Sequence, residues 1–154
     1  EKLPTLKKYL KEGKKQDIQL ILEIKSHKDK KVENKVASDV VKMVKKMGLE
    51  HQVEYIAFSL NICEQLVKLT PKSEIAYLNG DLSPAELKEK GINGIDYHLN
   101  VLFNHPEWVE EAHKLGMKVN VWTVNKVEDM QKFIDMGVDY ITTDHPLELQ
   151  KLLE

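Results

Sequence analysis

The sequence predicts an α/β fold in which six parallel strands alternate with helices. Two observations predict this class: six short apolar segments follow one another along the chain, and segments with helical periodicity lie between them. A third observation is that glycines end most of the helical segments and that no linker or low-complexity stretch interrupts the series. The 154 residues therefore suit one compact domain.

The first half of the chain is expected to contain three strands and three helices. An amphipathic helix that opens near Pro4 and ends at Gly13 leads into the first strand. Valines and methionines recur every three or four residues before Gly48, which predicts a long helix with a glycine stop. The strands are expected at residues 19–25, 53–59 and 74–78, and a further helix at 61–69.

The second half continues the alternation. Ser83, Pro84 and Glu86 form the pattern of a capped helix start, with an N-cap, a proline in the first turn and a glutamate at the third helical position. Gly91 ends that helix. The remaining strands are expected at residues 94–98, 118–124 and 138–143, and the remaining helices at 106–115, at 127–136 and from 146 onward.

Strands that alternate with helices in this way are parallel, and they form either an open doubly wound sheet or a closed barrel. No Gly-x-Gly-x-x-Gly pattern follows any strand, so the dinucleotide-binding sheet loses its main support. A barrel places its site at the carboxyl ends of the strands, where Glu23, Lys25, Ser59, Trp122 and Asp144 fall. Because six strands cannot close an eight-stranded barrel, we expect either an incomplete chain or partner strands from another copy.

Composition excludes several classes of function. No segment is apolar enough to cross a membrane, and a net charge of -2 argues against a general nucleic-acid binder. Every basic residue is a lysine and none is an arginine, so phosphate recognition must use point charges and backbone amides. The single cysteine, Cys63, excludes an internal disulfide and is expected to be a small buried residue in a helix.

Glu23 and Lys25 are the first candidate site residues, because period two places both on one face of the first strand. A charged pair at the end of a buried strand is costly unless something compensates it. A carboxylate binds a hard divalent cation, and a neighbouring lysine binds a phosphate that the cation also holds. Two other interpretations stay open: a structural salt bridge inside a barrel, and a Schiff-base role for Lys25 in apolar surroundings.

Four segments in order also match a known family pattern. They are Leu-Glu-Ile-Lys at 22–25, Ala-Phe-Ser at 57–59, Val-Trp-Thr-Val-Asn at 121–125, and Gly-Val-Asp-Tyr-Ile-Thr-Thr-Asp-His-Pro at 137–146. The chain resembles the glycerophosphodiester phosphodiesterases over essentially all of its length. The resemblance implies that residues 1–154 are a single domain, the carboxyl-terminal portion of a TIM barrel of the phosphodiesterase type.

The resemblance also implies a chemistry in lipid metabolism. Members of the family hydrolyse glycerophosphodiesters to glycerol 3-phosphate and an alcohol, with a divalent cation and two histidines as general acid and base. In that pattern Glu23 matches a metal ligand, Lys25 a phosphate-contacting lysine and Trp122 an aromatic residue at the glycerol end of the pocket. Asp144 matches a recurrent residue for which we expect a structural role. Calcium and magnesium both suit an oxygen-ligand site.

The departure from the family is large. A His-Arg segment, a Glu-x-Asp metal pair and a His-Asp segment are all absent from this sequence. The family's catalytic histidines are therefore not in this chain, and His27 and His98 are the candidates that lie near the expected site face. One carboxylate is too few for useful metal affinity, so we predict that the isolated chain is inactive.

Further alternatives follow from the missing strands. The chain is either a hydrolase whose first third lies outside this sequence, or a noncatalytic barrel fragment or strand-swapped assembly that retains only phosphate binding or a structural role. Exposed sheet edges and an exposed barrel interior favour a homodimer. The absence of disulfides fits the cytoplasm and the periplasm equally, and the alcohol leaving group is not encoded in any motif found here.

Overall fold

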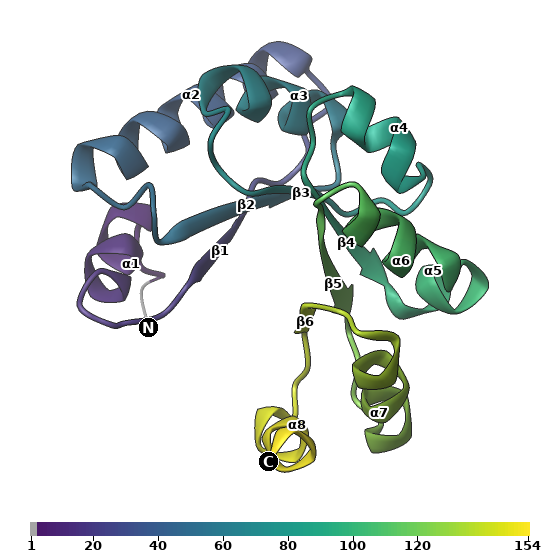
Figure 1. The fold of residues 1–154 in the computed structure, drawn as a ribbon. Helices are drawn as coiled ribbons and strands as arrows, with labels where there is room; N and C mark the ends of the chain where they lie inside the picture. The colour runs from purple at the N-terminus through teal and green to yellow at the C-terminus, as the bar shows by residue number, and fades with distance from the viewer. Residues whose placement is uncertain (1–2) are drawn as a thin grey trace. The chain divides into compact units, whose positions relative to one another are not determined.

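The computed structural model of the protein describes residues 3–154. The chain divides into two compact units, and the boundary falls between Ile75 and Ala76 (Figure 1). In each unit strands alternate with helices along the chain, and neighbouring strands pair in parallel in the order of the sequence. The predicted alternation and the parallel pairing are therefore confirmed.

The first unit begins with a helix and continues with two strand-helix pairs. In Figure 1, α2 and α3 pack against each other and cover one face of the paired strands β1 and β2. The elements of this unit are α1 (Leu6–Gly13), β1 (Leu20–Glu23), α2 (Lys30–Met47), β2 (Val53–Ala57) and α3 (Leu60–Leu69).

Register separates the two faces of these strands. Leu20 pairs with Val53, and Glu23 pairs with Ile56, so side chains at paired positions point to the same face. Val53 is buried beneath the helices, as are the alternate residues of β2. The opposite face carries Ile21, which is 50% exposed, and Glu23. This less covered face is the one on which a barrel enzyme builds its interior and its site.

Local sequence signals explain the ends of α2. The Asp29 side chain accepts a hydrogen bond from the Lys31 amide at 2.8 Å and caps the amino end. Gly48 has a φ of 64°, a left-handed conformation in which glycine carries no Cβ penalty, and it ends the helix as predicted. Ala37 and Val44 lie fully buried on the inner side of the helix.

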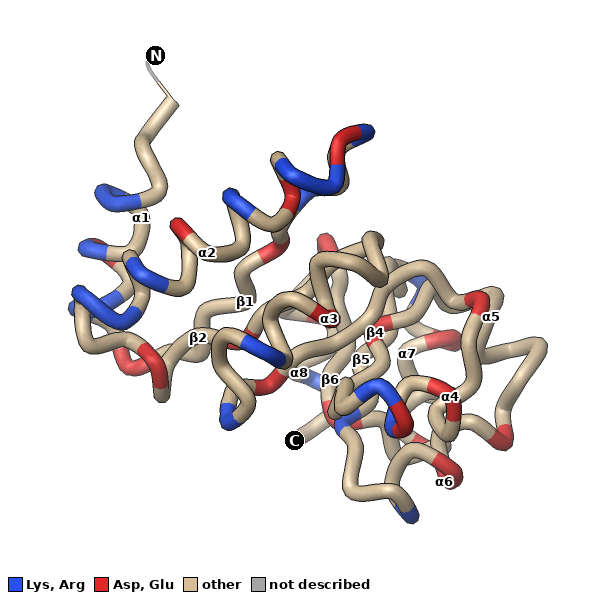
Figure 2. The backbone as a smooth tube through the Cα atoms, turned by 90° about the horizontal axis from the view of Figure 1, so that it is seen from above, with Lys and Arg blue, Asp and Glu red and all other residues tan. Residues whose placement is uncertain are grey.

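Lysines recur along α1 and α2, as the blue segments in Figure 2 show. Some of them form ion pairs on their own helix, such as Lys15 with Glu12 at 2.8 Å and Lys35 with Asp39 at 2.5 Å. These side chains are exposed, so the pairs contribute little to stability.

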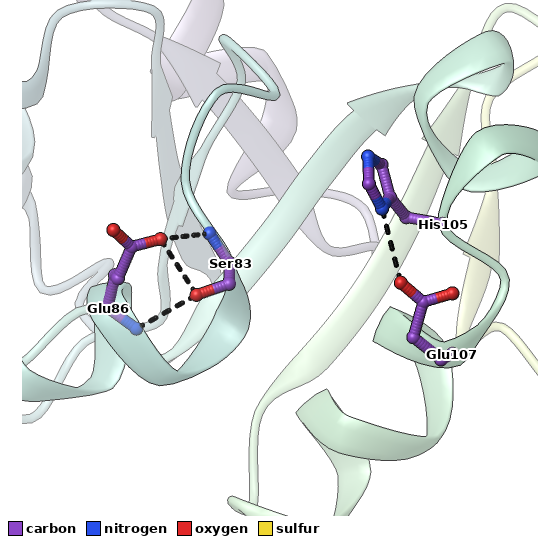
Figure 3. A network of polar contacts seen from close by, with 4 residues as sticks. All are labelled: Ser83, Glu86, His105 and Glu107. Carbon is purple, nitrogen blue, oxygen red and sulfur yellow. Dashed lines mark hydrogen bonds and ion pairs between the residues drawn. The ribbon is translucent and has the colours of Figure 1, made fainter.

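The second unit contains the remaining strands and five helices among the described residues. Its elements are β3 (Ile75–Tyr77, from its second residue), α4 (Pro84–Glu89), β4 (Gly94–His98), α5 (Leu99–Asn104), α6 (Glu107–Lys114), β5 (Lys118–Trp122), α7 (Val127–Met136), β6 (Tyr140–Ile141) and α8 (Pro146–Leu153). The predicted capping box is confirmed at α4, where the Ser83 amide and hydroxyl both donate to Glu86 at 2.8 Å (Figure 3).

Several details differ from the sequence-based expectation, among them the ends of β2 and β5, which stop at Ala57 and Trp122, each two residues earlier than expected. α5 was not expected, because it is six residues long and its N-cap is a histidine, without the usual serine, threonine or aspartate signal. β1 ends at Glu23, so Lys25 lies in the following loop and not in the strand. β6 has only two residues, against an expected segment of 138–143.

The core of the second unit lies between its strands and helices. Ile95, Val119 and Val121 are completely buried, and Phe133 of α7 stacks on Phe103 with ring centroids 4.6 Å apart. As in the first unit, alternate strand residues face away from this core. None of the helices described over residues 3–154 has the length and apolar character to cross a membrane.

Candidate active site at the carboxyl ends of the strands

Glu23 and Lys25 contact each other where β1 ends. The Lys25 Nζ lies 2.7 Å from Glu23 Oε1, although Lys25 lies in the loop after the strand. Their exposure differs strongly, because the Lys25 side chain is 79% exposed and that of Glu23 only 28%. The expected cost of burying a charged pair therefore falls on Glu23 alone, and the exposed ammonium recovers little of it.

One oxygen of Glu23 is distinctive. Among the residues that the structure describes, Oε1 is a buried side-chain oxygen that accepts no hydrogen bond. The 2.7 Å approach of Lys25 Nζ is an ion-pair distance without hydrogen-bond geometry, so it does not satisfy the lone pairs of this oxygen. Buried carboxylate oxygens normally have partners, and a missing one requires an explanation.

Glu23 Oε1 is the right type of ligand for a divalent cation, but the described residues offer too few such ligands. An anionic oxygen without a hydrogen bond is the ligand that calcium and magnesium prefer. No group of three or more histidine, cysteine, aspartate or glutamate side chains within residues 3–154 is arranged to hold a metal. Glu23 can therefore supply one protein ligand, and the remaining ligands must come from elsewhere.

The Schiff-base interpretation of Lys25 is not supported. A lysine activated for carbonyl chemistry needs apolar surroundings or a second cation that favours its neutral form. The Lys25 side chain is 79% exposed and pairs with a carboxylate, so it lacks the apolar surroundings that this chemistry needs.

Glu33 is a buried residue that the sequence analysis did not single out. Its Oε1 accepts a hydrogen bond from the His27 amide at 3.1 Å, and its Oε2 accepts from Ser59 Oγ at 2.9 Å and Asn61 Nδ2 at 2.8 Å. Burial opposes ionisation, but the hydrogen bonds from His27, Asn61 and Ser59 together hold the pKa of Glu33 below its usual value. The carboxylate joins the loop after β1 to the start of α3.

A sequence signal for Glu33 did exist. The residue lies four positions before Ala37 and seven before Val40, on the stripe of α2 that faces the core. A charged residue at such a position is 4% exposed here and needs partners. Ser59, expected among the site residues, is one of those partners and also caps α3 through the Ile62 amide at 3.4 Å.

Trp122 ends β5 in the second unit and is fixed by two contacts. Its Nε1 donates to the backbone oxygen of Asp96 at 2.9 Å, and its ring meets that of His98 edge to face with centroids 5.0 Å apart. Register places His98 directly opposite Trp122 on the face that points away from the core. The peptide bond from Trp122 to Thr123 is cis. The indole is thus held at the end of its strand, as a residue that lines a pocket must be.

His27 and His98 do not fit a role as general acid or base. The Nδ1 of His27 accepts a hydrogen bond from the Asp29 amide at 2.9 Å, and the Nδ1 of His98 accepts one from the Asn100 amide at 3.2 Å. Each neutral ring therefore carries its proton on Nε2, and a lone pair at Nε2 would require a proton on the nitrogen that faces the amide. The His98 ring caps α5, and the His27 ring holds the amide of Asp29, the residue that caps α2.

Asp144 has the contacts of a structural residue, as expected. Its Oδ2 accepts from Asn125 Nδ2 at 2.8 Å, and its amide donates to Asn125 Oδ1 at 2.9 Å. These reciprocal bonds tie the loop after β5 to the loop after β6. The structure thus brings Glu23 and Lys25 together in the first unit and places Trp122 beside His98 in the second.

The fold and these residues define an α/β protein of the TIM-barrel type, with polar and aromatic side chains at the carboxyl ends of parallel strands. The model of the Glycerophosphoryl diester phosphodiesterase family matches residues 1–148, and the chain belongs to this family. The predicted family and the predicted fold class are therefore confirmed.

Individual relatives agree with this assignment. The chain is 30% identical over 122 residues to a glycerophosphodiester phosphodiesterase of Caldanaerobacter subterraneus subsp. tengcongensis, over 77% of this chain and 49% of the relative. A crystal structure of a glycerophosphodiester phosphodiesterase from Parabacteroides distasonis is 52% identical with a TM-score of 0.97, over 99% of this chain and 65% of that one. A putative glycerophosphoryl diester phosphodiesterase from Silicibacter pomeroyi is 27% identical with a TM-score of 0.87, over 97% of this chain and 56% of that one. The chain thus spans about half to two thirds of the length of these relatives.

Proposed function

We propose that the chain forms part of a metal-dependent hydrolase of glycerophosphodiesters, which releases glycerol 3-phosphate and an alcohol. The observation that carries the proposal is the buried Glu23 Oε1, which accepts no hydrogen bond and lies beside an exposed lysine. Membership of the phosphodiesterase family supports the choice of substrate class. The prediction that residues 1–154 make up a single domain of a larger barrel belongs to the same proposal.

Each proposed site residue has one role. Glu23 would be a ligand of a divalent cation, calcium or magnesium, which when bound polarises a phosphoryl oxygen. Lys25 would place its ammonium against a phosphate oxygen, because its side chain is 79% exposed and lies beside Glu23. Trp122 would present its fixed ring to the glycerol carbons, because its polar Nε1 is already bonded to Asp96.

Acid-base catalysis is the part that the described residues do not supply. His27 and His98 hold their Nδ1 atoms against backbone amides, and the family's His-Arg and His-Asp segments are absent from the sequence. Loss of a general acid or base costs about 100-fold to 10,000-fold in rate per group. We therefore propose that these 154 residues alone hydrolyse glycerophosphodiesters at no significant rate.

The test compares the 154-residue chain with a longer chain, in which the same residues are joined to the segment encoded upstream of them. Each is given glycerophosphocholine with calcium or magnesium, and glycerol 3-phosphate is measured. We expect turnover only from the longer chain, and its loss in the Glu23→Gln and Lys25→Ala variants, whereas Glu12→Gln on the exposed face of α1 should have no effect. Turnover by the 154 residues alone would overturn the proposal.

A second measurement separates hydrolysis from binding alone. Titration of the longer chain with calcium should give an affinity that falls at least tenfold in Glu23→Gln. Phosphate binding that depends on Lys25 without any turnover in the longer chain would instead support the noncatalytic alternative.

A further inference from the structure

We infer that Glu33 is a positioning residue for Lys25, acting through the loop between β1 and α2. The inference deepens the proposed function, because it rests on Lys25 being the group that binds phosphate. Glu33 itself touches neither Lys25 nor Glu23, and its effect is transmitted by the backbone of residues 24–29.

Two anchors define the freedom of this loop. At its start the Ile24 amide donates to the Ile56 oxygen at 3.0 Å, and the Ile24 side chain is 3% exposed. Two residues after Lys25, the His27 amide donates to Glu33 Oε1 at 3.1 Å. Only Lys25 and Ser26 lie between the anchors. The backbone of Lys25 is therefore held on both sides, while its side chain is 79% exposed and pairs with Glu23.

Glu33 is suited to this task because its partners come from two separate loops. Its other oxygen accepts from Ser59 and Asn61 at the start of α3, so the loop after β1 is fastened to the loop after β2. Both oxygens accept hydrogen bonds from donors within the fold. Its carboxylate is retained in a 4% exposed position, where a charge is costly unless it has partners.

The consequence for binding is entropic. If the His27 anchor is lost, the free segment extends from Lys25 to the cap of α2 at Asp29, whose side chain holds the Lys31 amide. Binding of phosphate must then order this longer segment, and ordering one or two additional residues weakens affinity by about tenfold. The ammonium is unchanged, so the loss comes from its position and not from its charge.

The experiment uses three variants of the protein. Glu33→Ala removes every acceptor, whereas Glu33→Gln keeps an oxygen for the His27 amide and an amide group that can donate to the Ser59 hydroxyl. Asp39→Asn is the matched control, because it removes a carboxylate from the same helix at an exposed position whose partner is Lys35. For each variant, amide hydrogen exchange is measured at residues 25–29 and inorganic phosphate is titrated by chemical-shift perturbation.

We expect Glu33→Ala to lose more exchange protection at His27 than in β1, and to bind phosphate about tenfold more weakly. Glu33→Gln should restore both properties, and Asp39→Asn should match the unmodified protein. Phosphate affinity that is unchanged in Glu33→Ala although His27 is released would overturn the positioning role. Retained protection at His27 in Glu33→Ala would show that the hydrogen bond from the His27 amide to Glu33 does not hold the loop, and would overturn the inference at its first step.

The outcome is distinguishable from a failure of the proposed function. That failure would appear as phosphate binding that is absent, or that does not change in Lys25→Ala, in an otherwise unmodified protein. The exchange measurement at His27 does not depend on any ligand, so it tests whether Glu33 holds the loop even if the proposed function fails.

Discussion

Replacement of Glu33 should destabilise the first unit in a way that depends on pH. Glu33 is 4% exposed and accepts hydrogen bonds from the His27 amide, Ser59 Oγ and Asn61 Nδ2 at 2.8–3.1 Å. Hydrogen bonds to a charged acceptor contribute about 1.5–3 kcal/mol each, but water can reach the three donors once the carboxylate is removed. We therefore expect Glu33→Ala to lower the free energy of unfolding by about 3 kcal/mol at pH 7. Glu33→Gln, which keeps one acceptor, should cost about 1 kcal/mol.

The pH dependence follows from the lowered pKa of Glu33. Because the folded-state pKa lies below the ordinary value of 4.5, the ionised carboxylate stabilises the fold fully above that pH. This contribution is lost as the pH falls below 4.5 and passes through the folded-state pKa. The difference between the unmodified protein and Glu33→Gln should therefore shrink toward zero in acid.

The assay must report on the first unit alone. Both tryptophans, Trp108 and Trp122, lie in the second unit, so their fluorescence does not serve. Hydrogen exchange of the β2 amides in increasing urea gives the required free energy, with Tyr55, whose amide donates to the Glu74 oxygen at 2.9 Å, as a probe. Asp39→Asn is the control. An equal loss in Glu33→Gln at pH 7 and pH 3, or no loss in Glu33→Ala, would refute the reasoning.

Three further predictions concern other parts of the chain. Burial raises the pKa of the Cys63 thiol to about 12, so iodoacetamide should label it at pH 8 only when the protein unfolds, and rapid labelling of the folded protein would contradict this. Trp122→Phe should remove the Nε1 bond to Asp96 and lower stability by about 1 kcal/mol in urea titrations, while Trp122→Tyr, which also lacks that donor, should lose the same amount. Exposed apolar side chains on the uncovered strand face, such as Ile21 at 50% exposure, should make the 154-residue chain sediment as a dimer or larger species, and a stable monomer would contradict the predicted association.

Periodicity predicted those parts of the fold that local sequence determines. α2 ends at Gly48, α7 spans Val127–Met136 and β4 spans Gly94–His98, all as expected. The two helices end at glycines in the left-handed conformation, and the strand is an apolar run that lies between turn residues. The alternation predicted that Glu23 and Lys25 share a strand face, and their side chains do form an ion pair at 2.7 Å, but Lys25 lies in the loop after β1.

Features that depend on distant partners were not predictable in this way. A strand continues only as far as its neighbour offers hydrogen bonds, and β2 ends at Ala57, so β1 ends near the position opposite Ile56 and Lys25 falls outside it. The side chains that donate to Glu33, those of Ser59 and Asn61, lie 26 and 28 residues away along the chain, a separation that no local spacing rule relates to a helix position. Sequence alone therefore identified Ser59 as a residue near the site but not the contact that it makes.

On the strand faces that the helices do not cover, residues at the strand end and residues two positions earlier differ in their contacts. Glu23 is the last residue of β1 and Trp122 is the last residue of β5, whereas Ile21 and Asn120 lie two residues earlier on the same face. Asn120 is already engaged, because its Nδ2 donates to Asp96 Oδ1 at 2.9 Å and to Thr142 Oγ1 at 3.1 Å. Asn120 is thus committed to its neighbours, whereas Glu23 at the end of its strand keeps an oxygen that accepts no hydrogen bond. A change at Glu23 should therefore affect ligands first, and a change at Asn120 should affect the fold first.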